Sequence, residues 1–132
     1  MAIRWNSANK YHNKKYTYLG IKFDSLKECR RYSELRLLEQ AGKIKDLQLQ
    51  KAYELIPAQY EETAEVYTKG IHKGEHKTKL LERAVVYRAD FTYTDCETCK
   101  QVVEDTKGMR TKEYVIKRKL LLWRFGIKIK EI

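Results

Sequence analysis

Apolar and polar residues alternate most regularly between positions 85 and 93. In an extended chain, one side of this segment carries five mostly apolar residues: Val85, Tyr87, Ala89, Phe91 and Tyr93. The other side carries three polar residues: Arg88, Asp90 and Thr92. A period of two is typical of a half-buried β-strand. A second arm, residues 101–108, follows after a short turn, so the pattern predicts a β-hairpin.

Two segments have helical spacing instead. The first runs from about Ser25 to Ala41 and ends at Gly42, a residue that commonly stops helices. Ser25 and Glu28 form a capping-box pattern, in which a glutamate side chain bonds back to the amide of the cap residue. Capping alone is therefore one interpretation of Glu28.

The second helical segment spans about Thr111 to Phe125, with Thr111 as the cap and Gly126 as the stop. Five apolar residues are predicted to form its buried side: Val115, Ile116, Leu120, Leu122 and Trp123. The opposite edge carries positive charge, which indicates either a solvated face or a row of phosphate contacts.

Three further segments have strand character: residues 16–23, residues 44–57 and residues 127–132. Pro57 ends the second of them, and lysines in the third discourage unwanted edge pairing. The predicted order is strand, helix, three or four strands, helix, strand. This order favours an α/β fold with a mixed central sheet flanked by two helices.

At 132 residues the chain is long enough for one domain, which we place at residues 16–132. Residues 1–15, rich in asparagine and lysine, are expected to form a flexible basic arm. Residues 59–81 change to alternating Glu, Thr, Lys, Gly and His, and are expected to be an excursion between two core strands. A loop of that length is usually functional or disordered.

The formal net charge is +10 and the sequence pI is about 9.5. Such an excess of Lys and Arg favours a polyanionic partner such as DNA, because these residues release counterions from the phosphate backbone. No apolar run approaches the ~20 residues of a membrane span. With no segment of signal-peptide character, we expect a cytoplasmic protein without a membrane partner.

The polar side of the hairpin brings two acids together. If its arms pair symmetrically about the turn, Asp90 lies directly opposite Asp105, with Cβ atoms roughly 4.5–5.5 Å apart. Like charges at that range repel, and a Mg²⁺ ion would offset the repulsion, because it takes one or two carboxylates. Lys107 projects from the same side. A register slip of one residue would put Glu104 there instead of Asp105.

The pattern of Asp90, a hairpin turn and then Asp105-x-Lys107 resembles the PD-(D/E)xK nuclease superfamily. With Gly108 and the segment from Thr111 to Lys119, it is similar to phage-encoded small proteins related to Holliday-junction resolvases. Ala89 departs from the proline of the superfamily name. The resemblance covers about residues 16–132, apart from the excursion, and implies a restriction-endonuclease-like α-β-β-β-α-β core.

The resemblance also implies roles for individual residues. Glu28 would join Asp90 and Asp105 around one or two Mg²⁺ or Mn²⁺ ions, and Lys107 would be catalytic. Gln50 would lie near the site. Candidate DNA contacts lie on the second helix: Lys112, Tyr114, Lys117, Arg118 and Arg124.

The expected function is therefore a metal-dependent DNA endonuclease selective for branched or Holliday-junction DNA, acting in phage recombination or replication in the host cytoplasm. Because a junction has two scissile strands related by a dyad, a homodimer is the expected assembly. The alternative is a non-catalytic nucleic-acid-binding protein on the same fold.

A second alternative is a zinc-stabilised adaptor that binds another protein. Cys96 and Cys99 form a C-x-x-C in the hairpin turn, and His72 and His76 form an H-x-x-x-H in the excursion. Together they supply four tetrahedral ligands, although the order of the two pairs is unusual for structural zinc. The competing interpretation is that all three cysteines, Cys29 included, are reduced thiols.

Overall fold

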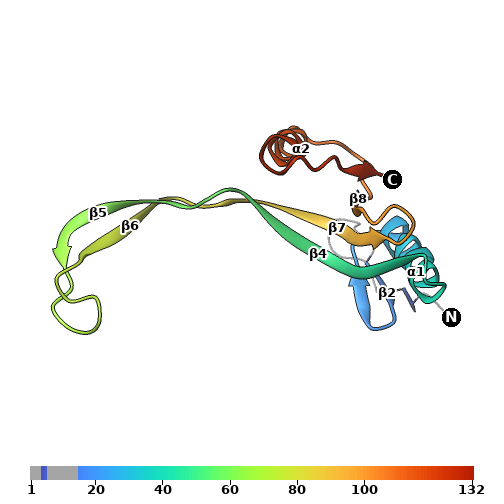
Figure 1. Ribbon diagram of the computed structural model, residues 1–132, viewed down its shortest axis with the longest axis horizontal. Coiled ribbons are helices and arrows are strands. Elements are labelled where there is room, and N and C mark those ends of the chain that lie inside the picture. Colours follow the sequence, from blue (N-terminus) through green and yellow to red (C-terminus); the bar gives the residue numbers. More distant parts are fainter. Residues whose placement is uncertain (1–3, 6–14) are drawn as a thin grey trace.

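Both arms of the predicted hairpin are inner strands of the central sheet. The computed structural model describes residues 4–5 and 15–132 (Figure 1). The sheet consists of β4 (Ile44–Ile56), β7 (Val85–Asp95), β8 (Gln101–Asp105) and β9 (Lys130–Glu131), in the order β4-β7-β8-β9. β7 is antiparallel to both β4 and β8, whereas β9 is parallel to β8. The sheet is therefore mixed, as predicted.

The register of β7 and β8 places the two aspartates side by side. Phe91 lies opposite Glu104, and Thr92 lies opposite Val103. Continuing this antiparallel register by one residue pairs Asp90 with Asp105. The predicted symmetric pairing about the turn is confirmed.

Both predicted helices form, with the predicted caps. α1 (Leu26–Gln40) starts after Ser25, whose hydroxyl accepts a hydrogen bond from the Glu28 amide at 3.1 Å. α2 (Lys112–Phe125) starts after Thr111, whose hydroxyl accepts from the Tyr114 amide at 3.1 Å. Gly126 ends α2 with a φ of 66°, in the left-handed conformation that glycine adopts without strain.

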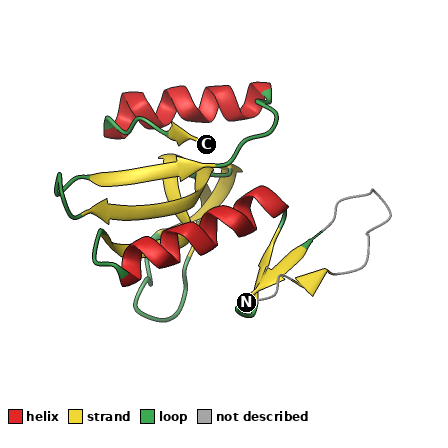
Figure 2. Ribbon diagram, turned by 90° about the vertical axis from the view of Figure 1, so that its right-hand side faces the viewer, coloured by secondary structure: helices red, strands yellow, loops and turns green. Residues whose placement is uncertain are grey.

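The two helices lie on opposite sides of the sheet (Figure 2). On the α1 side the core is largely aromatic and includes Tyr18, Phe23, Tyr32, Phe91 and Tyr93. On the α2 side it includes Tyr53, Tyr87, Val103, Tyr114 and Leu121. The fold is thus mixed α/β in three layers, with β8 and its acids between the helices.

The predicted buried side of α2 was right only in part: Val115 and Leu120 pack against the core, but the other three predicted residues do not. Ile116 and Trp123 are 58% and 81% exposed, while Tyr114 and Leu121 are the buried residues of the helix. Apolar residues occur on almost every side of this helix, so spacing alone did not fix which side faces the sheet. Tyr114 fixes it in the structure, because its ring is buried and its hydroxyl donates to Glu131 at 3.1 Å.

The apolar row of β7 also departs from the simple prediction of one buried face. Tyr87 and Ala89 belong to the core on the α2 side, whereas Phe91 and Tyr93 belong to the core on the α1 side. Thr92, predicted to lie on the polar face, is buried. An inner strand is covered on both faces here, and strand twist changes the direction of side chains along its 11 residues.

The excursion is an ordered hairpin, made of β5 (Gln59–Val66) and β6 (His76–Glu82). It continues β4 and β7 as a twisted two-stranded ribbon that projects far from the helices (Figure 1). Pro57 separates β4 from β5, so β4 ends where the sequence predicted.

A second hairpin, β2 (Tyr16–Tyr18) and β3 (Ile21–Phe23), leads into α1, and β1 (Arg4–Trp5) pairs with β2. Apart from β1 and residue 15, the predicted N-terminal arm lies outside the described residues. In the described part of the chain, neither helix is long and apolar enough to cross a membrane.

Candidate metal and phosphate site

Asp90 is held in place by a threonine at the end of β8. Its Oδ2 atom accepts two hydrogen bonds from Thr106, one from the amide and one from the hydroxyl, both at 2.8 Å. Its Oδ1 atom accepts a longer bond of 3.4 Å from Gln50 Nε2. Gln50 is therefore near the acids, as the resemblance implied. One oxygen of Asp90 is left only weakly bonded.

Asp105 is completely buried, and within the described part of the chain only one of its oxygens is hydrogen-bonded. Oδ2 accepts from the Tyr87 hydroxyl at 2.6 Å. Oδ1 lies 3.6 Å from Lys107 Nζ and, among the described residues, has no hydrogen-bond partner. A buried carboxylate oxygen without a partner carries a large desolvation penalty, so an incoming cation or hydrogen-bond donor would stabilise it.

Burial, with a smaller contribution from neighbouring charges, raises the pKa values of Asp105 and Glu28. Burial raises the pKa of Asp105 to about 6; the bond from Tyr87 opposes this effect, and the charge of Asp90 adds to it. Burial raises the pKa of Glu28 to about 7, with further contributions from the charges of Asp90, Asp24 and Asp105. Lys107 lowers both pKa values, but not enough to cancel the rise. Acids with raised pKa values are typical of functional sites, although structural networks also produce them.

Glu28 projects from the first turn of α1 toward the same region. It lines a cavity of about 300 Å³ together with Asp24, Gln50 and Asp90. The Ser25 hydroxyl bonds the Glu28 amide, but in the described residues the Glu28 carboxylate does not bond back to the Ser25 amide. Only half of the predicted capping box is formed, and the Glu28 carboxylate is left facing the cavity.

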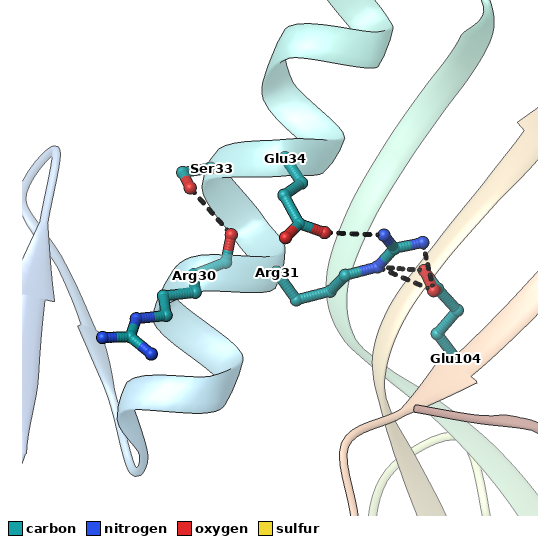
Figure 3. A network of polar contacts seen from close by, with 5 residues as sticks. All are labelled: Arg30, Arg31, Ser33, Glu34 and Glu104. Carbon is teal, nitrogen blue, oxygen red and sulfur yellow. Dashed lines mark hydrogen bonds and ion pairs between the residues drawn. The ribbon is translucent and has the colours of Figure 1, made fainter.

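Glu104 lies on the other side of β8, where it contacts α1 (Figure 3). Arg31 donates to it from Nε at 2.9 Å and from Nη2 at 2.6 Å, and Arg31 Nη1 also bonds Glu34 at 2.8 Å. Glu104 is thus a buried, charge-paired structural residue. Asp105, not Glu104, is the acid that accompanies Asp90.

A basic cavity of about 390 Å³ adjoins the acids on the α2 side. Its lining includes Arg88, Lys107, Thr111, Tyr114 and Lys117. The Lys107 ammonium lies 5.2 Å from the centre of the Tyr114 ring, a cation–π contact that holds it between this cavity and Asp105. Lys107, Tyr114 and Lys117 are therefore brought together as predicted, although Lys117 also pairs with Glu113 at 2.9 Å.

The other predicted DNA contacts are placed differently. Arg118 is bonded to Glu131 at 2.9 Å, and Arg124 donates to the Leu55 carbonyl at 2.8 Å, so both guanidinium groups help hold α2 to the sheet. Lys112 is exposed at the start of α2. Of the predicted basic row, Lys117 thus lines the cavity, whereas Arg118 and Arg124 hold α2 to the sheet.

The four proposed zinc ligands do not come together. His72 and His76 belong to the end of the β5–β6 ribbon, where each bonds a neighbouring residue of that ribbon. Cys96 and Cys99 are exposed in the β7–β8 turn, at the opposite end of the molecule (Figure 1). No group of three or more His, Cys, Asp or Glu side chains capable of holding a metal occurs within the described residues.

That finding also limits the acidic site, because Glu28, Asp90 and Asp105 do not form a preassembled three-carboxylate cage. Mg²⁺ does not require one, since it binds through one or two carboxylates and keeps several waters. The pair of Asp90 and Asp105, with one oxygen unbonded and another weakly bonded, fits that requirement.

Sequence reasoning missed two residues of the site. Tyr87 was assigned to the apolar row of β7, and Thr106 was passed over between Asp105 and Lys107. The position of Thr106 inside the motif was an available signal. Nothing in the spacing indicates that the hydroxyl of Tyr87 reaches Asp105.

Comparison with known proteins identifies one family. The family model described as "Protein of unknown function (DUF1064)" matches residues 8–131. No curated protein and no solved structure matches the chain.

Proposed function

The chain belongs to the DUF1064 family, whose function is unknown, and we propose that it is a metal-dependent DNA endonuclease with a restriction-endonuclease-like core. The observation that carries the proposal is the pairing of Asp90 with the buried, half-bonded Asp105 beside Lys107. This is the constellation on which the resemblance to PD-(D/E)xK nucleases rests.

Asp90 and Asp105 would hold Mg²⁺ or Mn²⁺ through the weakly bonded oxygen of Asp90 and the unbonded oxygen of Asp105. When bound, such an ion polarises the scissile phosphate and lowers the pKa of a water. Glu28 would add a third negative charge at the edge of the cavity that it shares with Asp90. Thr106 and Tyr87 would position the two aspartates.

Lys107 would act on the phosphate itself. Its ammonium is partly exposed and lies between Asp105 and the basic cavity. From there Nζ would orient the attacking water or neutralise negative charge that develops on the phosphate oxygens. Arg88 and Lys117 would contact the neighbouring phosphates of the strand. Hydrolysis would leave a 5′-phosphate and a 3′-hydroxyl, as the resemblance implies.

Branched DNA, such as a Holliday junction formed during phage recombination or replication, is the proposed substrate class. Cleavage of both strands of a junction would be served by a homodimer, because the two scissile phosphates are related by a dyad. The net charge of +10 supports a polyanionic substrate.

The test is cleavage of end-labelled junction, flap and linear duplex DNA, each with Mg²⁺ and with EDTA. We expect junction cleavage only with the metal, and its loss in the variants Asp90→Asn and Lys107→Ala, with DNA affinity in EDTA within about threefold of the parent protein. Asp46→Asn is the matched control, because Asp46 is exposed, lies outside the site and has a φ of 57°, which asparagine tolerates.

A non-catalytic nucleic-acid-binding protein is the second candidate. It is favoured by the complete burial of Asp105 and by the lack of a three-ligand metal group among the described residues. Tight junction binding with no cleavage in Mg²⁺ or Mn²⁺ would establish this candidate over the nuclease.

A further inference from the structure

The β5–β6 ribbon ends in a well-defined loop far from the acidic site (Figure 1). Two backbone hydrogen bonds close the loop, from the Tyr67 amide to the Glu75 carbonyl at 3.0 Å and from the Gly74 amide to the Tyr67 carbonyl at 2.9 Å. Gly70 and Gly74 turn the chain with φ values of 85° and 91°. The loop is therefore a shaped tip and not a loose connection.

One large apolar side chain stands at this tip. Ile71 is 93% exposed, more than any other large hydrophobic residue in the described part of the chain. Lys69 and Lys73 flank it at two residues' distance on each side. DNA has anionic phosphate backbones on the outside and stacked, largely apolar bases between them. An apolar side chain between two cations is complementary to that arrangement.

Acids outnumber lysines on the strands of the ribbon by four to two, whereas its tip, residues 67–75, carries two lysines and one glutamate. Lys77 lies 3.8 Å from Glu65, and Lys79 is paired in register with Glu61. Lys69 and Lys73, in contrast, take part in no ion pair within the described residues. The unneutralised positive charge of the ribbon is thus concentrated on the two lysines beside Ile71.

We propose that the tip of the β5–β6 ribbon is a DNA clamp, in which Ile71 inserts between base steps in the minor groove while Lys69 and Lys73 contact the phosphates on either side. Two-stranded ribbons are used by proteins that read DNA grooves, and apolar wedges of this kind unstack a base step and kink the duplex. This inference deepens the proposed function and rests on it.

The dimensions of the ribbon determine where the clamp acts. β5 has eight residues, and at ~3.3 Å per residue it alone spans about 26 Å. Counted from the β4 residue beside Asp90, residues 51–66 span up to about 50 Å at this rise, which is about one and a half helical turns of DNA (~34 Å each). The clamp therefore grips one arm of a branched substrate while the strand to be cut lies at Asp90 and Asp105.

The charge contribution is tested with the double variant Lys69→Glu/Lys73→Glu. The matched control is Lys43→Glu/Lys100→Glu, which makes the same change in net charge at exposed positions near the β7–β8 turn. Affinity for a fluorescent linear duplex is measured by anisotropy in EDTA, over a range of salt concentrations. We expect the tip variant to bind at least about tenfold more weakly than the control, with a salt slope smaller by about two.

The wedge is tested with Ile71→Ser in the full chain. Energy transfer between dyes at the two ends of a short duplex reports bending on protein binding. We expect the parent protein to bend the duplex and Ile71→Ser to bend it much less, because only the apolar side chain can unstack the step. A bend unchanged in Ile71→Ser, or equal affinity losses in the tip and control variants, would overturn the proposal.

These experiments, together with the cleavage assay, test the clamp proposal and the nuclease proposal independently. A tip that proves irrelevant to binding, in a protein that still cleaves junctions, defeats the clamp alone. A tip required for binding, in a protein that never cleaves, defeats the nuclease alone. If the tip variants instead change the oligomeric state in sedimentation while duplex affinity stays constant, the partner of the tip is a second copy of the chain and the proposal is wrong.

Discussion

Glu104 and Asp105 are adjacent on β8, and both are completely buried, yet their charges are compensated to different degrees. Glu104 accepts two hydrogen bonds from Arg31. Asp105 accepts one from the Tyr87 hydroxyl, and its other oxygen lies 3.6 Å from the Lys107 ammonium. Because β-strand side chains alternate, one backbone position separates an acid that stabilises the fold from one that does not. The two acids should therefore respond oppositely to neutralisation.

We expect Glu104→Gln to lower the free energy of unfolding by about 3 kcal/mol, because it leaves the partly buried Arg31 without its main counter-charge. Asp105→Asn should lower it by less than about 1 kcal/mol or raise it, because the Tyr87 bond is kept and a buried charge is removed. Urea denaturation of both variants at pH 7.5 in EDTA measures the difference. A larger loss for Asp105→Asn than for Glu104→Gln would show that Asp105 is a structural residue.

At the scale of single elements, α2 connects the site to the edge of the sheet. It begins a few residues after Lys107 and is fastened through Tyr114, Arg118 and Glu131. Its ends are fixed by Thr111 and by Gly126, whose amide donates to the Leu122 carbonyl. The position of the basic cavity therefore depends on where this helix stops and on how its first turn is held.

We expect Gly126→Ala to destabilise the protein by about 1 kcal/mol, since an alanine at a φ of 66° is strained although nothing lies within 4 Å of the added Cβ. Gly108→Ala is the control, because the space around Gly108 is equally open and its φ is not in the left-handed range. Thermal unfolding followed by circular dichroism compares the two. Equal effects would mean that the cost arises from something other than backbone strain.

For the whole molecule, the hydrophobic pattern predicted the features that depend on local periodicity, namely strand register and helix boundaries. The register of β7 and β8 followed from their alternation and from the turn between them, and both helices began at the predicted caps. The side of α2 that faces the sheet followed only in part. Val115 and Leu120 pack against the core as predicted, but spacing did not show that Tyr114 and Leu121, rather than Ile116 and Trp123, are the buried residues. The bond from Tyr87 to Asp105 depends on strand twist, which spacing does not encode.

The free energy of unfolding should depend on pH through two acids of the site, Asp105 and Glu28. The folded-state pKa values of Asp105 and Glu28 are raised to about 6 and about 7, above the ordinary values of 3.8 and 4.5. The folded state thus binds more protons than the unfolded state between about pH 4 and pH 7. In this window the two groups make the free energy of unfolding fall as pH rises, on the order of 2 kcal/mol in total.

Urea titrations from pH 4.5 to pH 8 in EDTA measure this fall. In the double variant Glu28→Gln/Asp105→Asn the fall should be much smaller, and adding Mg²⁺ to the parent protein at pH 7.5 should recover stability by pairing the charges. A parent protein whose stability rises throughout this range would contradict the raised pKa values.

The two exposed thiols of the β7–β8 turn, Cys96 and Cys99, have a practical consequence, because the third cysteine, Cys29, is fully buried. A thiol-reactive dye should label the native protein at that turn and spare the interior. The label would stand at the end of the molecule remote from the ribbon tip (Figure 1). The chain thus carries its own attachment point for single-molecule observation, without any engineered cysteine.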